Sequence, residues 1–380
     1  MGDDELFQRA FDAFALCYYG LTTVDQEAVS AASRKYAGAL DALRKALCQQ
    51  ETQLQDQTLL SIMLLANCDE HLVDDDTRSR LLQGYTHIRG ALALLALREK
   101  NGLSTSEQLE LNGITRGRLL RQVIYVGEVP SSHLTEAIAN RDASANEILN
   151  LYLAEIAVIR RDAHRLLANR RSPSSSIGRQ RRKAAAELIR QSLALKKLSM
   201  WQETCSRASS YKRGQFSEEQ FHVLESKGIC FSRMFGDYSE GGIGAAVMLD
   251  RCRAARVICL SSAVRVITMS PEVVLQIAAS STQLNDWTAR AQTALETAHQ
   301  LINEILESIP AFFASSLSEN HISMLNDPHE ASLAKLGQLI WLLIVVSSVT
   351  CCLEAQRHFA KGVIGLMYIL NGSRTLKQAA

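Results

Sequence analysis

The chain of 380 residues has little proline, little net charge and almost no strand signal. Because proline breaks the helical hydrogen-bond ladder, a count of only five permits long helices. Lys and Arg total 41 against 40 Asp and Glu, so no overall charge favours nucleic-acid binding. No Asn-Gly hairpin turn lies between two alternating apolar runs. These absences exclude a strand-rich fold and predict a helical one.

Metal-ligand spacing is absent as well. The nine cysteines include no Cys-x-x-Cys pair, so a structural zinc site is not expected. Most cysteines stand in apolar, helix-like surroundings, where a free thiol behaves as a small hydrophobic side chain. The pattern predicts reduced thiols in a nuclear or cytoplasmic protein, with no metal and no cofactor.

One long uncharged segment raises the question of a membrane span. Residues 336–353, LGQLIWLLIVVSSVTCCL, stand between Lys335 and Glu354 and are nearly long enough to cross a bilayer. The segment also contains Gln338 and a Ser-Ser-Val-Thr patch. A helix surrounded by other helices has the same composition. We therefore predict a buried helix and no membrane contact, since nothing else in the chain resembles a span.

Apolar residues recur at spacings of three and four along most of the chain, which is typical of amphipathic helices. The sequence predicts an all-α fold, a single large array of packed antiparallel helices. We expect an N-terminal helical half over 1–169, a basic, serine-rich linker over 170–183, and a C-terminal helical half over 184–380 packed on the first. Within the last part, the Gly-rich Glu240–Ala246 is expected to be a flexible loop. Residues 309–331 are also expected to form a loop, after a helix that ends near Ser308, and residues 330–370 are expected to form one or two closing helices.

The segment LLSIMLLANCDEHL, residues 59–72, is apolar until it reaches Asp69. Asp69 follows Leu65 by four residues, so it should point toward packed neighbours, and a buried carboxylate needs a partner. The next helix offers His87, beside the small residues Gly90 and Ala91. We predict an Asp69–His87 contact that acts as a structural latch. A catalytic acid/base pair is the alternative, because ion-pair networks resemble active sites.

Two arginine-rich segments are further candidates. The linker could act as a nuclear-import signal, contact phosphates or be a plain solvated loop. A helix near 250–267 carries four arginines that could line a pocket or reach acids such as Asp250 or Glu272, although a solvated face is favoured. The import candidates are Arg170, Arg171, Arg179, Arg181, Arg182 and Lys183, and the pocket candidates are Arg251, Arg253, Arg256 and Arg265.

Three motifs together resemble the helical regulatory domain of fungal zinc-cluster transcription factors. In that family a leucine-rich helix ends in an acid, and the next helix carries an aromatic residue and His-x-x-Gly-Ala. Here Asp69 replaces a more usual Glu and Tyr85 a more usual Trp. The matching residues are Leu64, Leu65, Asp69, Tyr85, His87, Gly90, Ala91, Leu94 and Leu95 in the first motif, Ser308, Pro310, Phe312 and Phe313 in the second, and Gln356, Arg357, Phe359, Asn371, Gly372, Gln378 and Ala379 in the third.

The resemblance implies a regulatory role in transcription, in a fungal secondary-metabolite pathway. No six-cysteine zinc cluster is present, so direct DNA binding is not expected. The protein would act through protein partners or as a homodimer, with a small-molecule ligand as a further candidate. The alternative function is a stand-alone biosynthetic enzyme, a cyclase or isomerase of a polyketide-like metabolite, that uses the helical domain as an apolar pocket. His87, Asp69 and Tyr85 are its candidate catalytic residues.

Overall fold

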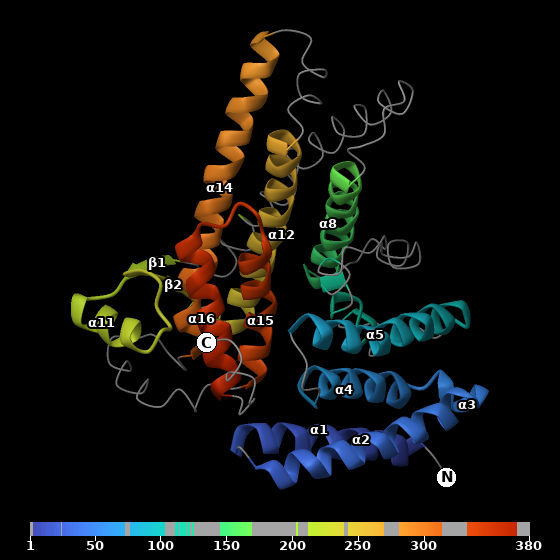
Figure 1. The fold of residues 1–380 in the computed structure, drawn as a ribbon. Coiled ribbons are helices and arrows are strands. Elements are labelled where there is room, and N and C mark those ends of the chain that lie inside the picture. The colour runs from blue at the N-terminus through green and yellow to red at the C-terminus, as the bar shows by residue number, and fades with distance from the viewer. Residues whose placement is uncertain are drawn as a thin grey trace. The chain divides into compact units, whose positions relative to one another are not determined.

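The computed structural model describes residues 3–23, 25–72, 77–102, 145–168, 212–238, 242–269, 281–313 and 333–370, with Glu203 and parts of 111–124. The fold of these residues is all-α, as the sequence predicts, with one small two-stranded sheet (Figure 1). The described residues divide into two compact units. The expected linker 170–183 lies outside the described residues.

The first unit contains helices stacked in successive layers, with α1 and α2 packed together, α4 against both, and α5 against α4 (Figure 1). Its core is made of small and branched apolar side chains such as Ala10, Ala39, Leu59 and Leu65, all fully buried. The helices are α1 (Asp3–Thr23), α2 (Gln26–Leu47), α3 (Gln50–Gln53), α4 (Asp56–Leu72) and α5 (Thr77–Lys100). The start of α8 (Ala145–Ala168) also belongs to this unit.

Local chemistry explains where α2 begins. The carboxylate of Asp25 accepts hydrogen bonds from the backbone N–H groups of Glu27 and Ala28, at 2.9 and 3.1 Å. These donors have no partner inside the helix, so an Asp at the N-cap satisfies them. Arg44 and Lys45 lie in the last turn, where positive charge favours the helix dipole.

The second unit is organised around two long helices, α12 (Gly242–Met269) and α14 (Ser281–Phe313), which pack side by side. Helix α15 (Leu333–Ser348) packs against both, and α16 (Glu354–Leu370) ends the described chain. The remaining elements are β1 (Lys212–Gln215), α11 (Glu218–Ser226), β2 (Met234–Asp237) and most of α8. Strands β1 and β2 are antiparallel, with Lys212 opposite Asp237, and β2 also packs against α14.

Three local expectations are corrected in this unit. The Gly-rich segment is helical from Gly242, because burial of Ala246 and the apolar residues that follow outweighs the weak helix propensity of glycine. Helix α14 continues through Pro310 to Phe313, since Ile309 and Phe312 are fully buried and hold the last turn in place. The sequence pattern predicts no strands, so the small sheet of β1 and β2 is not anticipated.

The long uncharged segment is buried, as predicted. Helix α15 ends at Ser348, and Leu339, Leu342 and Val346 along it have no exposed surface. Within the described part of the chain, no helix is both long enough and apolar enough to cross a membrane.

Candidate functional site

A three-residue polar cluster links α2, α4 and α5 in the first unit, and we call it the latch. The Tyr36 hydroxyl donates a hydrogen bond to Asp69 Oδ1. His87 Nε2 lies 3.1 Å from Asp69 Oδ2 and 3.0 Å from the Tyr36 hydroxyl oxygen. If Nε2 carries the proton, it donates toward both oxygens, and every polar atom facing the cluster has a partner. The predicted Asp69–His87 contact is therefore confirmed.

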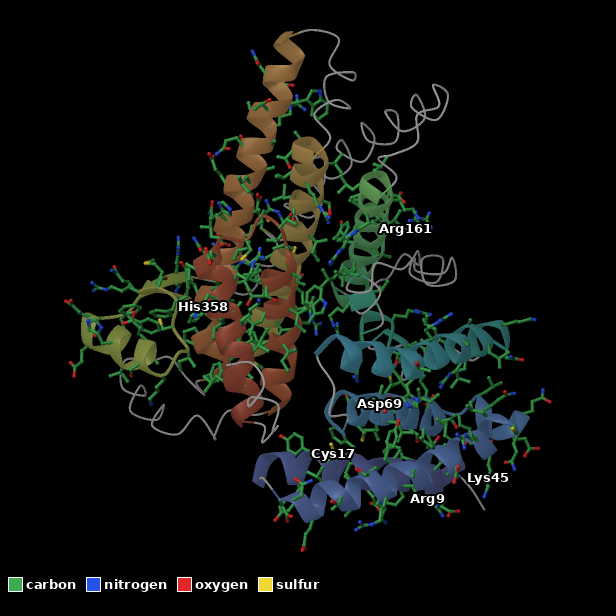
Figure 2. The ribbon with its side chains drawn as sticks, in the orientation of Figure 1. Arg9, Cys17, Lys45, Asp69, Arg161 and His358 are labelled. Atoms are coloured by element: carbon green, nitrogen blue, oxygen red, sulfur yellow. The ribbon has the colours of Figure 1, made fainter. Side chains whose placement is uncertain are left out.

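The latch is largely shielded from water. The side chains of His87 and Asp69 are 16% and 12% exposed, and the Tyr36 ring packs edge-on against the imidazole with centroids 6.3 Å apart. Burial, together with the hydrogen bond to Asp69, raises the pKa of the Tyr36 phenol, so the phenol stays protonated and donates. Figure 2 shows Asp69 on α4 among the side chains of the first unit.

The sequence places Asp69 and His87 correctly but misses Tyr36. Asp69 follows the fully buried Leu65 by one helical step, which directs it inward. Tyr36 belongs to α2, and no pattern in the sequence specifies which face of α2 meets α4. The structure describes Tyr85 only as part of α5, and its side chain lies outside what is described.

The small residues near His87 play different parts. Ala91 is fully buried where α5 packs on α4. Gly90 is exposed, and a Cβ atom added there would meet nothing within 4 Å. The close approach of the two helices therefore depends on Ala91 and does not require a glycine at position 90.

The sequence pattern does not identify a buried ion pair that also belongs to the first unit. Arg98 on α5 has no exposed surface and forms an ion pair with Asp56 at the start of α4. Its Nε and Nη1 atoms make no hydrogen bond. This pair joins the ends of α4 and α5 opposite to the latch, so polar contacts fix the helix pair at both ends.

In the second unit Arg253 is the centre of a buried ionic cluster, which we call the Arg253 cluster. The guanidinium is 1% exposed and donates to Asp250 Oδ1 at 2.6 Å and to the Tyr238 hydroxyl at 2.8 Å. Its Nε donates to Glu304 Oε2 on α14 at 2.9 Å. The expectation of a solvated face is thus wrong for Arg253, because Asp250 and Glu304 neutralise its charge within the α12–α14 interface.

Asp250 is the most strongly perturbed carboxyl of this cluster. Complete burial raises its pKa to about 6, although the charge of Arg253 acts in the opposite direction. Its Oδ2 atom makes no hydrogen bond to another described group. One buried arginine therefore faces two carboxylates, and burial raises the pKa of Asp250.

The other three candidate arginines lie on the same helix as Arg253, and the charge of Glu304 in the Arg253 cluster also acts on Arg256. Burial lowers the pKa of Arg251 to about 10 and also lowers that of Arg256. Arg265 has a buried Nε atom that makes no hydrogen bond. The pKa of His164 on α8 is lowered mainly by burial and further by the charge of Arg265. These side chains are partly buried around α12, which contradicts a uniformly solvated face. Glu272 lies outside the described residues.

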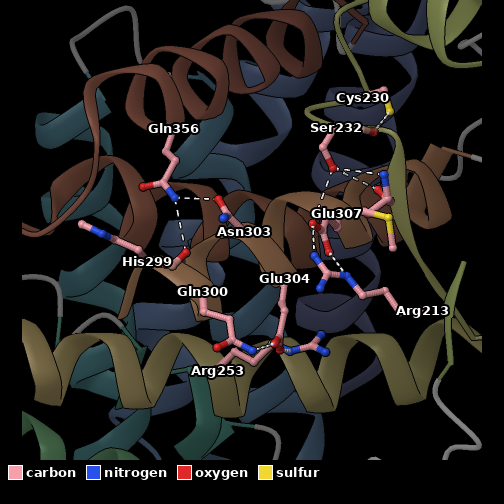
Figure 3. A network of polar contacts seen from close by, with 11 residues as sticks. Arg213, Cys230, Ser232, Arg253, His299, Gln300, Asn303, Glu304, Glu307 and Gln356 are labelled. Atoms are coloured by element: carbon pink, nitrogen blue, oxygen red, sulfur yellow. Dashed lines mark hydrogen bonds and ion pairs between the residues drawn. The ribbon is translucent and has the colours of Figure 1, made fainter. Parts of the chain in front are cut away.

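Helix α14 presents a row of polar side chains, shown in Figure 3. At its C-terminal end the buried carboxylate of Glu307 accepts two hydrogen bonds from Arg213 of β1, at 2.6 and 3.0 Å. One turn earlier, Asn303 Oδ1 accepts a hydrogen bond of 2.7 Å from the amide of Gln356 on α16. Glu304, between them, belongs to the Arg253 cluster. Helix α14 is therefore the common partner of β1, α12 and α16.

The described residues of the C-terminal motif, Gln356, Arg357 and Phe359, serve the packing of α16, whereas Asn371, Gly372, Gln378 and Ala379 lie outside the described residues. Gln356 is 1% exposed, and its Oε1 accepts from the Leu353 backbone N–H at 2.9 Å, which caps the helix. Arg357 donates to the carbonyl of Val349 at 3.0 Å, and Phe359 packs against Phe231 with centroids 5.2 Å apart. The bonds of Gln356 and Arg357 stabilise the turn between α15 and α16, and the Phe359 contact joins α16 to the segment between α11 and β2.

The basic import candidates between Arg170 and Lys183 lie outside the described residues. Among the residues that the structure does describe, no group of three or more His, Cys, Asp or Glu side chains is arranged to hold a metal ion. Comparison of the chain with known protein families, curated proteins and solved structures finds no match.

Proposed function

We propose that the chain is a transcription-factor-like regulatory protein of a fungal secondary-metabolite pathway, which acts through protein partners or as a homodimer. In this proposal protein partners supply the contact with DNA. The proposal starts from the three sequence motifs and their resemblance to the helical regulatory domain of fungal zinc-cluster factors.

The latch is the structural observation that supports this proposal. At the motif residues Asp69 and His87, the polar groups bond to each other and to Tyr36 across three helices. Gln356, in the last motif, is likewise bonded to Asn303 on another helix. Because these polar groups already bond to one another between helices, they favour a rigid binding scaffold. In such a scaffold the motif residues stabilise the fold and do not take part in a reaction.

Nuclear import of the full chain tests this proposal. We expect Arg181→Ala with Arg182→Ala to reduce nuclear accumulation of a fluorescent fusion several-fold, and to lower transcripts of the pathway genes in parallel. The matched control is Arg44→Ala with Lys45→Ala, an exposed basic pair at the end of α2, which should leave both readouts unchanged. A cytoplasmic protein indifferent to Arg181 and Arg182, with unchanged transcripts, contradicts the proposal.

The same geometry also favours the alternative, an enzyme that acts on a polyketide-like metabolite. Tyr36, Asp69 and His87 are three acid/base groups within hydrogen-bond distance of one another, and proton transfer by such groups accelerates cyclisation and isomerisation. Tyr36 joins Asp69 and His87 in the candidate set, and the side chain of Tyr85 lies outside what the structure describes.

The variants His87→Gln and Tyr36→Phe distinguish the two functions. In an enzyme, each should reduce turnover of a pathway intermediate at least about 100-fold, while the helical circular dichroism and the Tm change little. In a regulator, purified protein shows no turnover, and both variants lower the Tm. Turnover that survives both substitutions would remove the latch from any catalytic role.

A further inference from the structure

Two buried thiols lie next to the latch, and the proposed function does not use them. Cys17 on α1 and Cys68 on α4 are 1% and 0% exposed and belong to one core cluster with Ala13 and Ala32. Their thiols share a side-chain hydrogen bond. Figure 2 labels Cys17 and, on α4, Asp69, the residue that follows Cys68.

Small side chains bring the two helices together around these thiols. Ala10 and Ala13 on α1 and Ala66 on α4 have no exposed surface, and α1 packs along α4 over much of its length. Alanine at a helix–helix contact lets the two backbones approach closely. A disulfide needs Cα atoms about 4.4–6.8 Å apart and an S–S bond of about 2.05 Å. Two thiols in hydrogen-bond contact across such an interface need only a small shift to reach that geometry.

The pair differs from an ordinary dithiol in its acidity. The Cys68 thiol hydrogen-bonds to the sulfur of Cys17, which lowers the pKa of Cys17, although burial acts in the opposite direction. Cys68 has its pKa raised by the same hydrogen bond, by burial and by the charges of Cys17 and Asp69. The first proton of the pair is therefore lost more easily than the second, and the thiolate, which is the nucleophile, forms at Cys17.

We propose that Cys17 and Cys68 form an oxidisable dithiol, which a hydroperoxide converts into a disulfide that joins α1 to α4. The Cys17 thiolate attacks the peroxide, the O–O bond breaks, and a sulfenic acid forms as water or an alcohol leaves. The sulfur of Cys68 then attacks the sulfenic sulfur, loses its proton and releases water. The two thiols lose two electrons in total, and the peroxide oxygens gain them.

The other cysteines of the described residues provide contrasts. Cys252 and Cys259 are equally buried but lie seven residues apart on α12, which is about 10.5 Å along the axis and too far for a disulfide. Burial raises the pKa of Cys259, which disfavours its thiolate. Cys48 is exposed, so it reports on general oxidation. Only at Cys17 and Cys68 do the described residues combine contact between two helices with a thiol of lowered pKa.

This dithiol is independent of the proposed regulatory function. A disulfide would fix α1 to α4 beside Asp69, and Tyr36 packs against the same core cluster. Oxidation would therefore restrain the helices that form the latch, and a peroxide signal would change the rigidity of the first unit in a regulator and in an enzyme alike.

The full-length reduced protein, treated with hydrogen peroxide, tests this proposal. Intact mass should fall by two hydrogens, and a digest at glutamate, which separates Cys48 from Cys68 at Glu51, should identify a Cys17–Cys68 peptide without reductant. Dithiothreitol should reverse the cross-link, and the oxidised form should have a Tm about 5 °C higher or more. The matched control Cys259→Ala should form the same cross-link to the same extent.

Cys17→Ala and Cys68→Ala should each abolish the cross-link, and alanine suits this alanine-rich cluster. If either variant loses its helical circular dichroism signal, the presence or absence of the Cys17–Cys68 peptide in the oxidised wild-type protein tests the proposal instead. The proposal is overturned if Cys17 and Cys68 remain free thiols at a peroxide concentration that fully oxidises Cys48. It is also overturned if the only cross-links found involve Cys48 or join two chains.

Discussion

The latch and the Arg253 cluster both hold helices together, but they do so with different side-chain chemistry. Both tie helices together through buried polar groups, but the latch uses a phenol, an imidazole and one carboxylate. The Arg253 cluster uses a guanidinium, which is always charged, with two carboxylates and a phenol. The Arg253 cluster must therefore keep a permanent cation together with its carboxylates, whereas the latch contains no arginine or lysine.

The difference predicts how each cluster fails. Removing one partner of a buried ion pair leaves an uncompensated charge, which costs more than losing a hydrogen bond between groups that can become neutral. We therefore expect the Arg253 cluster to be the more fragile of the two and the more dependent on pH.

The largest effect is expected for Arg253→Met, which keeps the shape and removes the charge. Asp250 and Glu304 then lose their common cation, and the free energy of unfolding should fall by about 3–5 kcal/mol. Urea denaturation followed by circular dichroism measures this change. Arg290→Met is the matched control, because its pair with Asp286 is more than half exposed, and it should cost less than about 1 kcal/mol. Equal losses in the two variants would contradict a special role for burial.

A pH series with Asp250→Asn should give the next largest effect. A raised carboxyl pKa stabilises the folded state below the unfolded pKa near 3.8, and this stability is lost as pH rises through about 6. Between pH 4 and 7 the stability of Asp250→Asn relative to wild type should therefore rise by about 2 kcal/mol. Urea denaturation at each pH measures the difference. A constant difference across the series would show that Asp250 does not take up a proton on folding.

The smallest effect is expected in the latch. Asp69→Ala removes the acceptor of the Tyr36 hydroxyl, so we expect a loss of about 1–2 kcal/mol, and Tyr36→Phe, which removes the donor, should cost about 1 kcal/mol. Since the two residues share one hydrogen bond, the double variant should lose less than the sum. A double-mutant cycle measured by urea denaturation checks this coupling, and strict additivity would mean that Tyr36 and Asp69 act separately.

The sequence predicts a polar contact in these clusters only where the two partners lie on consecutive helices. Asp69 and His87 belong to consecutive helices, so helical spacing and the need of a buried carboxylate for a partner were sufficient. Tyr36 joins them from α2, and Glu304 reaches Arg253 from a helix about fifty residues away. Such pairings depend on the tertiary arrangement, which residue spacing does not contain.

The all-α class followed from low proline content and apolar spacing, but packing decided the local exceptions. Pro310 remains helical because Ile309 and Phe312 are buried on either side of it, and Gly242–Ala246 is helical because the segment enters the core. Local propensity differs by about 1 kcal/mol per residue for glycine, which the burial of one large apolar side chain exceeds.

The pairing of Arg213 with Glu307 has a consequence for how the second unit opens. Strands β1 and β2 are four residues each, too short for an isolated hairpin to persist in water. The ribbon therefore depends on its attachment to α14, and its amide protons should exchange with solvent whenever that attachment breaks, well before the long helices unwind. Deuterium uptake at Lys212–Gln215 would thus give an early measure of how often the surface of α14 becomes uncovered.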